Sequence, residues 1–408
     1  MAIIRPFRAI RPNPFYADQL VLTKPQAESV SGDNHNPEAL LPLKDLLETG
    51  ARLRPESPKG QETAFREIND TLRLLIENDR LHPDETPSIY IYEVEHRGYT
   101  QTGIWALTQL PDEHSEEIKT HELTFDDSVR RLKNYRENIG LEGNPILLTY
   151  AANRTIESII AAVKARQKHS TLGNSLGVHR LWKIEDEVIQ KQLVKAFATI
   201  GTVYLADGHH RLESATKLAQ KQRNNGLTVY NAISSLYMAD DQLRIQEYDR
   251  VVIPEHPVDK EELFKKLLRN FYLREASANH PVQPREPRKF GMYIQGEWYH
   301  LMAKRHICEN RGVASNLDAA ILQAEVLAPL FGIDDPRTSP HLKCIGGGQA
   351  MDEILPFIAE NPQSVVFTIC PMTVEQLTAV ADAGEILPPK STWIDPKVPY
   401  GLLLNLHR

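Results

Sequence analysis

The sequence has little of what marks membrane proteins, disulfide-bonded proteins or zinc ribbons. Its 408 residues include only three cysteines, Cys308, Cys344 and Cys370, and no CxxC pair. We therefore expect reduced thiols and no zinc ribbon. No run approaches the roughly 18 apolar residues of a membrane span, and the apolar start of the chain is too short for the core of a signal peptide. These absences predict a cytoplasmic protein with no membrane partner.

The chain also lacks an excess of basic residues. It has 47 lysines and arginines against 54 aspartates and glutamates, which gives a formal net charge of −7. Because proteins that coat nucleic acid normally carry a basic surface or stripe, the charge argues against a nucleic-acid partner. The 41% hydrophobic and 25% charged residues are typical of globular proteins. At roughly 100–200 residues per domain, we expect two or three domains.

Predicted helices and strands mix along the chain without regular βαβ alternation. A helical period of apolar residues predicts helices at 62–78, 125–138, 185–200, 211–224, 261–271, 317–331, 350–359 and 373–383, and another that Asn153 caps. Runs rich in β-branched and aromatic residues predict strands at 88–94, 102–110, 146–150, 180–184, 202–206 and 364–369, and a hairpin at 289–300. Residues 167–178 are predicted to be a loop. This mixture predicts an α+β (mixed α/β) fold.

The most informative stretch, Asp-Gly-His-His-Arg at residues 207–211, lies between a predicted strand and a predicted helix. Gly208 lets the backbone turn sharply and approach a ligand, and the start of the helix favours an anion. Arg211 adds a fork of donors that suits phosphate oxygens. His209 and His210 can donate hydrogen bonds or move protons near neutral pH. Asp207 is a candidate base for an attacking hydroxyl, or a ligand for a magnesium ion that travels with phosphate.

The competing interpretation of this stretch is an ordinary turn with surface histidines. Five polar or special residues directly after an apolar strand favour the functional interpretation. Zinc is the weaker functional choice, because adjacent histidines point in different directions and share one metal poorly.

Two further clusters carry polar groups that suit phosphate chemistry. In His121-Glu122-Leu123-Thr124, the glutamate is a candidate general base, and Arg131 downstream is a candidate phosphate clamp. The HExxH spacing of a zincin is absent, and spacing alone slightly favours a solvated charged segment. The proline-flanked loop 387–393 contains Lys-Ser-Thr without the GxxxxG of a P-loop. It can reach a phosphate or serve as a structural loop, and the sequence leaves both open.

Two other motifs have simpler interpretations. The three glycines at 346–348 precede a predicted helix without a GxGxxG pattern, which favours a flexible turn over an anion cradle. Asp249-Arg250 precedes two valines and is predicted to be a surface pair at the start of a strand.

Taken in order, these motifs resemble the bacterial domain-of-unknown-function family ten-fifteen. The matching segments lie at 5–8, 87–92, 121–124, 206–211, 389–392 and 396–397. The turn at 207–211 in turn resembles the phosphate-binding turn of the ParB/sulfiredoxin superfamily, which includes kinases acting on free L-serine. The resemblance implies a ParB/sulfiredoxin-like catalytic region with an N-terminal extension over 1–255. Residues 256–408 would form an additional α/β C-terminal region that contributes the Lys-Ser-Thr loop.

The resemblance also implies a function: phosphorylation of free L-serine to O-phosphoserine, with pyrophosphate or a nucleotide as donor and Mg²⁺ as cofactor. A homo-oligomer is compatible with the sequence. The catalytic residues it implies are Asp207, Glu122, His209 and His210. The phosphate-binding residues it implies are Gly208, His209, His210, Arg211, Arg131, Lys390, Ser391 and Thr392. His121 and Thr124 would bind the acceptor, and Asp207 would hold the metal.

Two hypotheses from other classes stay open at this point. One is a non-enzymatic, ParB-like protein that binds a nucleotide and DNA, against which the acidic charge and the lack of a basic helix-turn-helix-like segment argue. The other is a metal-dependent hydrolase that uses His209, His210 and Glu122.

Overall fold

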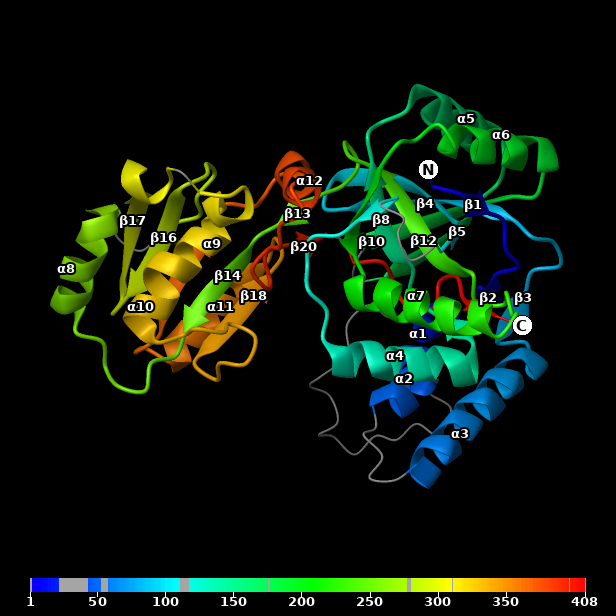
Figure 1. Cartoon of the computed structure of the whole chain (residues 1–408), viewed down its shortest axis with the longest axis horizontal. Coiled ribbons are helices and arrows are strands. Elements are labelled where there is room, and N and C mark those ends of the chain that lie inside the picture. The colour runs from blue at the N-terminus through cyan, green and yellow to red at the C-terminus, as the bar shows by residue number, and fades with distance from the viewer. Residues whose placement is uncertain are drawn as a thin grey trace. The chain divides into compact units, whose positions relative to one another are not determined.

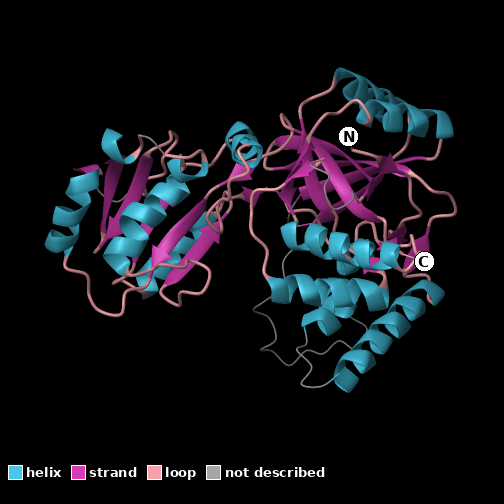
Figure 2. Cartoon of the chain, in the orientation of Figure 1, coloured by secondary structure: helices cyan, strands magenta, loops and turns pink. Residues whose placement is uncertain are grey.

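The computed structural model describes residues 2–21, 43–52, 58–110, 117–174, 177–276, 280–309, 311–395 and 397–407. The chain forms two compact units, shown in Figure 1 and Figure 2: the first contains residues 1–243 and 396–408, and the second contains 244–395. The chain thus leaves the first unit ahead of the expected boundary at 255, and its last residues return to the first unit. In the described ranges, no helix is long and apolar enough to cross a membrane.

A mixed sheet organises the first unit. Its strands lie in the order β6 (Ile118–Lys119), β11 (Val203–Asp207), β8 (Ile146–Tyr150), β12 (Ala232–Ala239), β5 (Tyr99–Gln109), β4 (Ile89–His96), β10 (Gly177–Ile184) and β9 (Ser170–Asn174), and β1 (Ile4–Arg5) pairs with β5. Smaller pairs join β2 (Ile10–Pro12) to β3 (Leu81–Pro83) and β7 (Leu141–Glu142) to β21 (Asn405–Leu406). Strand β8 is parallel to β12 and antiparallel to β11, so the end of β11 lies beside the start of β8.

The helices of the first unit gather in two groups around this sheet (Figure 1). Helices α5 (Arg154–Arg166) and α6 (Glu187–Phe197) lie together, and α7 (His209–Asn224) lies with α4 (Asp126–Ile139), α2 (Leu43–Arg52) and α3 (Pro58–Glu77). The short helix α1 (Ala17–Leu20) contacts β9. The apolar sides of α5, α6 and α7 share one core with alternate residues of β8 and β12. The sheet and these helices therefore fix the position at which β11 ends and α7 begins.

The second unit contains an antiparallel sheet between two apolar layers. Its strands lie in the order β15 (Phe271–Glu275), β17 (Glu297–Ala303), β16 (Lys289–Ile294), β19 (Val365–Ile369), β14 (Tyr248–Val252) and β18 (Leu342–Gly346), and β13 (Ile245–Gln246) pairs with β20 (Trp393–Ile394). Its helices are α8 (Lys260–Asn270), η1 (Arg305–Ile307), η2 (Ala314–Asn316), α9 (Asp318–Leu322), η3 (Gln323–Leu327), α10 (Ala328–Phe331), α11 (Ala350–Glu360) and α12 (Val374–Asp382). Successive residues of β19 enter different clusters: Val365 and Phe367 pack in one and Val366 in the other. This alternation is the period of two expected of a strand.

The α+β class is confirmed, and most of the predicted elements form near their expected positions. The stretch 167–178 is an exception, because it contains β9 and the start of β10, which pair as a hairpin. The predicted helix at 317–331 is continuous but includes a π-helical turn, η3. Helix α7 begins at His209, two residues before the predicted start, so both histidines are in its first turn.

Asp249 and Arg250 are buried, and their prediction as a surface pair is wrong. They lie within β14, which has neighbours on both sides, and are 0% and 2% exposed. Arg250 donates to the carbonyl oxygens of Tyr248 (2.7 Å) and Lys390 (2.9 Å). Asp249 Oδ1 accepts from the backbone N–H of Ile369 at 3.1 Å, while Oδ2 has no hydrogen-bond partner in the described ranges. Burial, reinforced by the nearby charge of Glu247, raises the pKa of Asp249 to about 8.

We expect Asp249→Asn to remove a pH-dependent loss of stability. An aspartate whose pKa is higher in the folded state stabilises the fold when protonated, and this contribution is lost as the pH rises from about 4 to about 8. The amide cannot ionise, so the free energy of unfolding of the variant should exceed that of the native protein more at pH 9 than at pH 5. Urea unfolding at both pH values measures this difference. Asp335, which is half-exposed and lies in the same unit, provides the control Asp335→Asn. An equal pH dependence of the two variants would contradict the prediction.

The glycines at 346 and 347 are required by close packing of aromatic rings. A Cβ atom on Gly346 would lie 2.6 Å from the ring of Tyr248, and one on Gly347 would lie 2.9 Å from Nε1 of Trp393. Gly347 also has a φ of +97°, which favours glycine. The ring packing accounts for these two glycines without a bound anion.

Candidate functional site

The candidate site is built on the turn between β11 and α7. The apolar strand β11 ends at Asp207, and Gly208 has a φ of +105°, in the left-handed region that glycine adopts most readily. A single residue, Gly208, therefore connects the strand to a helix of 16 residues. The first N–H groups of a helix have no partner within it and carry the positive end of its dipole. The geometry matches the strand–turn–helix arrangement expected from the sequence.

Two cations hold the carboxylate of Asp207. Arg211, one turn along α7, forms an ion pair with Oδ2, and Lys397 Nζ lies 3.1 Å from Oδ1. Arg211 also donates to the carbonyl oxygen of Pro145, just before β8, so its guanidinium spans the two strand ends. Burial alone would raise the pKa of Asp207, but the charges of Lys397 and Arg211 outweigh it and lower this pKa to about 2. Asp207 is therefore ionised at neutral pH.

Lys397 was not predicted as a site residue. It lies 190 positions from Asp207 in the sequence and reaches it because residues 397–407 return to the first unit. Its only signal in the sequence was its place in the segment Pro396-Lys397, which carried part of the family resemblance.

His209 lies in a buried group of polar side chains next to Asp207. Its Nδ1 is 3.5 Å from Oε2 of Glu122, and its ring meets the ring of His121 edge-on, with 4.5 Å between the centroids. Burial lowers the pKa of His209 to about 3 and that of His121 to about 4. Both rings are thus neutral at pH 7, so they can donate or accept hydrogen bonds but add no positive charge. The ring nitrogens of His121, which is 1% exposed, have no hydrogen-bond partner in the part of the chain described.

His210 and Thr124 connect the segment before α4 to helix α7. The Nε2 atom of His210 accepts a hydrogen bond from the backbone N–H of Phe125 at 3.0 Å, and the two rings stack 5.4 Å apart. Thr124 donates its hydroxyl to the carboxylate of Glu213. These contacts fix the segment that carries His121 and Glu122 against the start of α7.

The structure therefore brings together most of the predicted site residues of the first unit. Asp207, Glu122, His121 and His209 surround the turn at Gly208, together with Arg211. Arg131 lies on the exposed side of α4, and its charge contributes to lowering the pKa of His210, after burial. The phosphate and acceptor roles of these residues stay predictions.

Lys390, Ser391 and Thr392 belong to the second unit. There, Lys390 Nζ lies 5.6 Å from the centroid of the Tyr248 ring, and the carbonyl of Lys390 accepts from Arg250. The hydroxyl of Ser391 donates to the carbonyl oxygen of Pro388 at 2.6 Å. These contacts order the loop within its own unit, and the predicted contact of the loop with phosphate stays a prediction.

The described side chains around Asp207 could help to hold a magnesium ion that is already bound to a phosphate, but they do not form a metal site by themselves. In the described residues, no three histidine, cysteine, aspartate or glutamate side chains come together as a metal-binding group. Asp207 offers one carboxylate, and cations occupy both of its oxygens. Magnesium at phosphate sites is commonly held by one or two carboxylates and the phosphates themselves.

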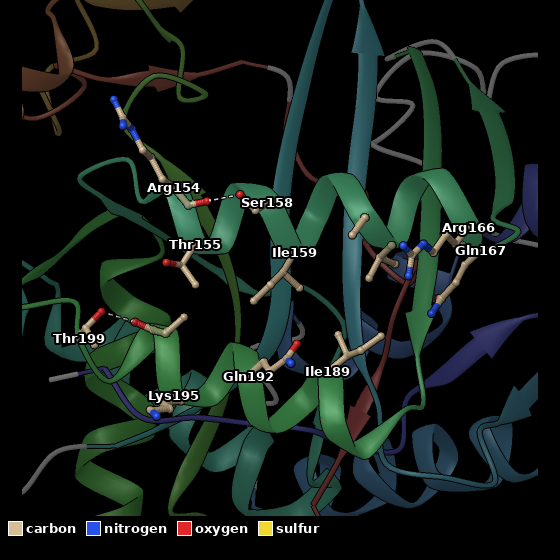
Figure 3. Close-up of a pocket in the computed structure, with 13 residues that line it drawn as sticks. Arg154, Thr155, Ser158, Ile159, Arg166, Gln167, Ile189, Gln192, Lys195 and Thr199 are labelled. Carbon is tan, nitrogen blue, oxygen red and sulfur yellow. Dashed lines mark hydrogen bonds between the residues drawn. The ribbon is translucent and has the colours of Figure 1, made fainter.

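Two cavities in the described part of the first unit differ in chemistry. One, of about 290 Å³, lies beside the turn and includes Arg131 and Arg211 in its lining. The other is a groove of about 810 Å³ between α5 and α6, where Figure 3 shows Arg154 and Arg166 at opposite ends. No acid, histidine or cysteine lines this groove. The carboxylate of Asp207 and its two cations lie next to the first cavity, whose lining includes Arg211.

We expect Gly208→Ala to disturb the site through Arg211. The added Cβ would lie 3.0 Å from Nε and Nη2 of Arg211 and 3.0 Å from Cγ2 of Ile146. At a φ of +105°, the alanine would also cost about 1–3 kcal/mol of backbone strain. Urea unfolding should show this loss of stability. If the turn binds pyrophosphate, isothermal titration should also show weaker binding than for the native protein.

Gly226→Ala is the matched control. Gly226 also has a positive φ, +74°, but nothing lies within 4 Å of its Cβ position. The control should lose stability and keep its affinity for pyrophosphate. If both variants bind pyrophosphate equally, Gly208 does not act through Arg211.

The first unit thus presents a charged strand–turn–helix site in an α+β chain. The chain belongs to the family described as protein of unknown function (DUF1015), which matches residues 4–320. No curated protein matches the sequence.

Several solved structures show a partial likeness at 13% sequence identity. The C-terminally truncated SbnI of Staphylococcus aureus gives a TM-score of 0.40, over 74% of this chain and 87% of that one. A free serine kinase variant in complex with AMP gives 0.37, over 73% and 92%. A conserved hypothetical protein from Pyrococcus furiosus gives 0.35, over 74% and 95%.

Proposed function

We propose that this protein is a phosphotransferase that phosphorylates the hydroxyl group of a small metabolite. The acceptor we propose is free L-serine, which would give O-phosphoserine, and the donor is pyrophosphate or a nucleotide. The observation that carries the proposal is the carboxylate of Asp207 held between Arg211 and Lys397 at the start of α7. A carboxylate, two cations and the start of a helix lie together there, which supports the proposal.

The site contains the groups that phosphoryl transfer needs from a protein. That reaction depends on positioning, on neutralising the charge of the transferred group and on a base for the attacking hydroxyl. Arg211 and Lys397 supply positive charge, and the first N–H groups of α7 supply donors. The serine hydroxyl oxygen would bond to the terminal phosphorus of the donor as the bond to the leaving phosphate breaks. The hydroxyl proton would pass to a carboxylate.

The charge balance of the turn suggests how Asp207 becomes a base. A carboxylate with a pKa of about 2 accepts protons poorly, because both cations stabilise its charged form. A phosphate group that engages Arg211 and Lys397 would draw these cations from Asp207 and raise its pKa. Glu122, half-exposed and 3.5 Å from His209, is the second candidate base. Magnesium, when bound to the donor, would neutralise part of the phosphate charge.

Phosphorus NMR tests the proposed reaction directly. The protein is mixed with L-serine and magnesium, and with pyrophosphate, ADP or ATP in separate samples. We expect the signal of O-phosphoserine to appear with at least one donor as that donor is consumed. If no donor is consumed and no O-phosphoserine forms, the proposed function is wrong.

A further inference from the structure

The cavity of about 290 Å³ beside the turn lies between α4, α7 and the returning C-terminal segment. Arg131, Leu132 and Tyr135 of α4 line one side, and Arg211 and Ser214 of α7 line another. Arg136, residues 141–144, Ile233 and Tyr400 complete the lining. The cavity therefore shares Arg211 with the site around Asp207.

The charge available to a ligand in this cavity is positive. Glu142 is the one acid in its described lining, and its carboxylate is already engaged by an ion pair with Arg136 and by hydrogen bonds from Asn405 (2.8 Å) and the backbone N–H of Ser234 (2.9 Å). Arg136 and Glu142 therefore neutralise each other. Arg131 is exposed and has no ion pair or hydrogen bond within the described ranges. Its guanidinium is available to a carboxylate, for which it has matching geometry.

The remaining walls suit a short carbon skeleton. Leu132, Leu141 and Ile233 are apolar, and Tyr135 and Tyr400 add aromatic rings. Gly143 allows Tyr400 to lie against the backbone, because a Cβ atom there would be 2.1 Å from Cζ of the tyrosine. The backbone N–H of Gly401 donates to the carbonyl of Gly143 at 2.8 Å, which fixes this wall. A cavity with a cation and apolar walls fits a small organic acid better than inorganic phosphate.

We propose that this cavity is the acceptor pocket and that Arg131 binds the carboxylate of the acceptor. The inference rests on the proposed phosphotransferase function and assigns Arg131 to the acceptor instead of to the donor phosphates. Arg211 lies between the cavity and Asp207 and contacts both regions. An amino acid held by its carboxylate at Arg131 would present its hydroxyl group on the side of the cavity that Arg211 lines.

Arg131→Gln tests this assignment, with Arg130→Gln as the matched control. Arg130 is the preceding residue of α4 and forms an exposed ion pair with Asp127. We expect Arg131→Gln to raise KM for L-serine at least tenfold with little change in kcat or in KM for the donor. The control should match the native protein. Ethanolamine, which keeps the hydroxyl and amino groups of serine but lacks the carboxylate, should be an equally poor acceptor for the native protein and for Arg131→Gln.

A second variant tests the cavity itself. Leu132→Trp would fill the space from a half-buried position on α4 and should also raise KM for L-serine, with thermal unfolding used to confirm that the variant folds. If Arg131→Gln changes KM for the donor and not for L-serine, Arg131 binds the donor and the proposal is wrong. It is also wrong if the folded Leu132→Trp variant keeps the native KM.

Calorimetry with L-serine alone separates this proposal from the proposed function. Suppose that the native protein binds L-serine but transfers no phosphate, and that Arg131→Gln lowers this affinity. The proposed pocket would then be supported, and the proposed phosphotransferase function would be wrong. Transfer that is unaffected by either variant would retain the phosphotransferase and exclude the pocket.

Discussion

Asp207→Asn is expected to lower kcat for phosphoryl transfer to L-serine about a thousandfold. The amide keeps the shape of the side chain but accepts no proton, and general base catalysis is worth about 10²–10⁴ in rate. The variant also leaves Arg211 and Lys397 without their shared carboxylate. Steady-state rates of O-phosphoserine formation at saturating L-serine and donor give the comparison.

The control for this variant is Asp70→Asn. Asp70 also forms an ion pair with an arginine, Arg73, but on the exposed surface of α3. We expect its kcat to equal that of the native protein. If Asp207→Asn keeps native kcat while Glu122→Gln loses it, then Glu122 is the base and Asp207 only organises the cations.

The second large effect concerns stability, and it follows from the buried ion pair between Glu142 and Arg136. The side chains of these residues are 8% and 6% exposed. Glu142→Gln would leave the guanidinium of Arg136 buried without its counter-ion, and breaking a buried pair in this way typically costs about 3–5 kcal/mol. Urea unfolding at pH 7 measures the loss. We expect the midpoint to fall while the dependence on urea concentration stays unchanged.

Glu137→Gln, on the helix that carries Arg136, is the matched control. Its partner Lys221 is half-exposed, and pairs of this kind contribute about 0–1 kcal/mol. A loss in this control as large as that in Glu142→Gln would contradict the prediction.

The buried pair also predicts how the native protein responds to acid. Burial opposes ionisation of Glu142, but the charges of Arg136 and His407 lower its pKa to about 2. A lowered carboxylate pKa stabilises the fold above its unfolded value, near 4.5, and this contribution is lost as the pH falls toward 2. Glu142→Gln should therefore approach the native stability as the pH decreases through this window. A constant difference between pH 7 and pH 3 would show that the lost stability does not come from this charge.

Local chemistry made several helix boundaries in both units predictable from the sequence. Asn153 caps α5 by accepting hydrogen bonds from two backbone N–H groups, and Thr373 begins α12 with a capping box. Gly140 ends α4 with a positive φ. At 207–211, an apolar strand, a glycine and a helical period lie within a few residues of one another. Each of these signals depends on neighbours in the sequence, so pattern analysis finds it.

Contacts between segments that are distant in the chain could not be predicted from the sequence. Nothing in the neighbourhood of Lys397 indicates that it pairs with Asp207, because that contact depends on the return of the chain after the second unit. Asp249 was misjudged for a related reason: its burial depends on strands that pair on both sides of β14. The sequence also suggested that His209 titrates near neutral pH. Its pKa is lower because His121 and the surrounding residues exclude water from it.

The return of residues 397–407 to the first unit sets the order in which the site can be assembled during synthesis. When residue 243 leaves the ribosome, Asp207 has Arg211 but not Lys397, and Glu142 lacks Asn405 and His407. The nascent chain must extend through the whole second unit before these partners arrive. At roughly 5–20 residues per second this takes on the order of ten seconds. The site of the first unit therefore stays incomplete until residues 397–407 are synthesised, which happens only after the second unit.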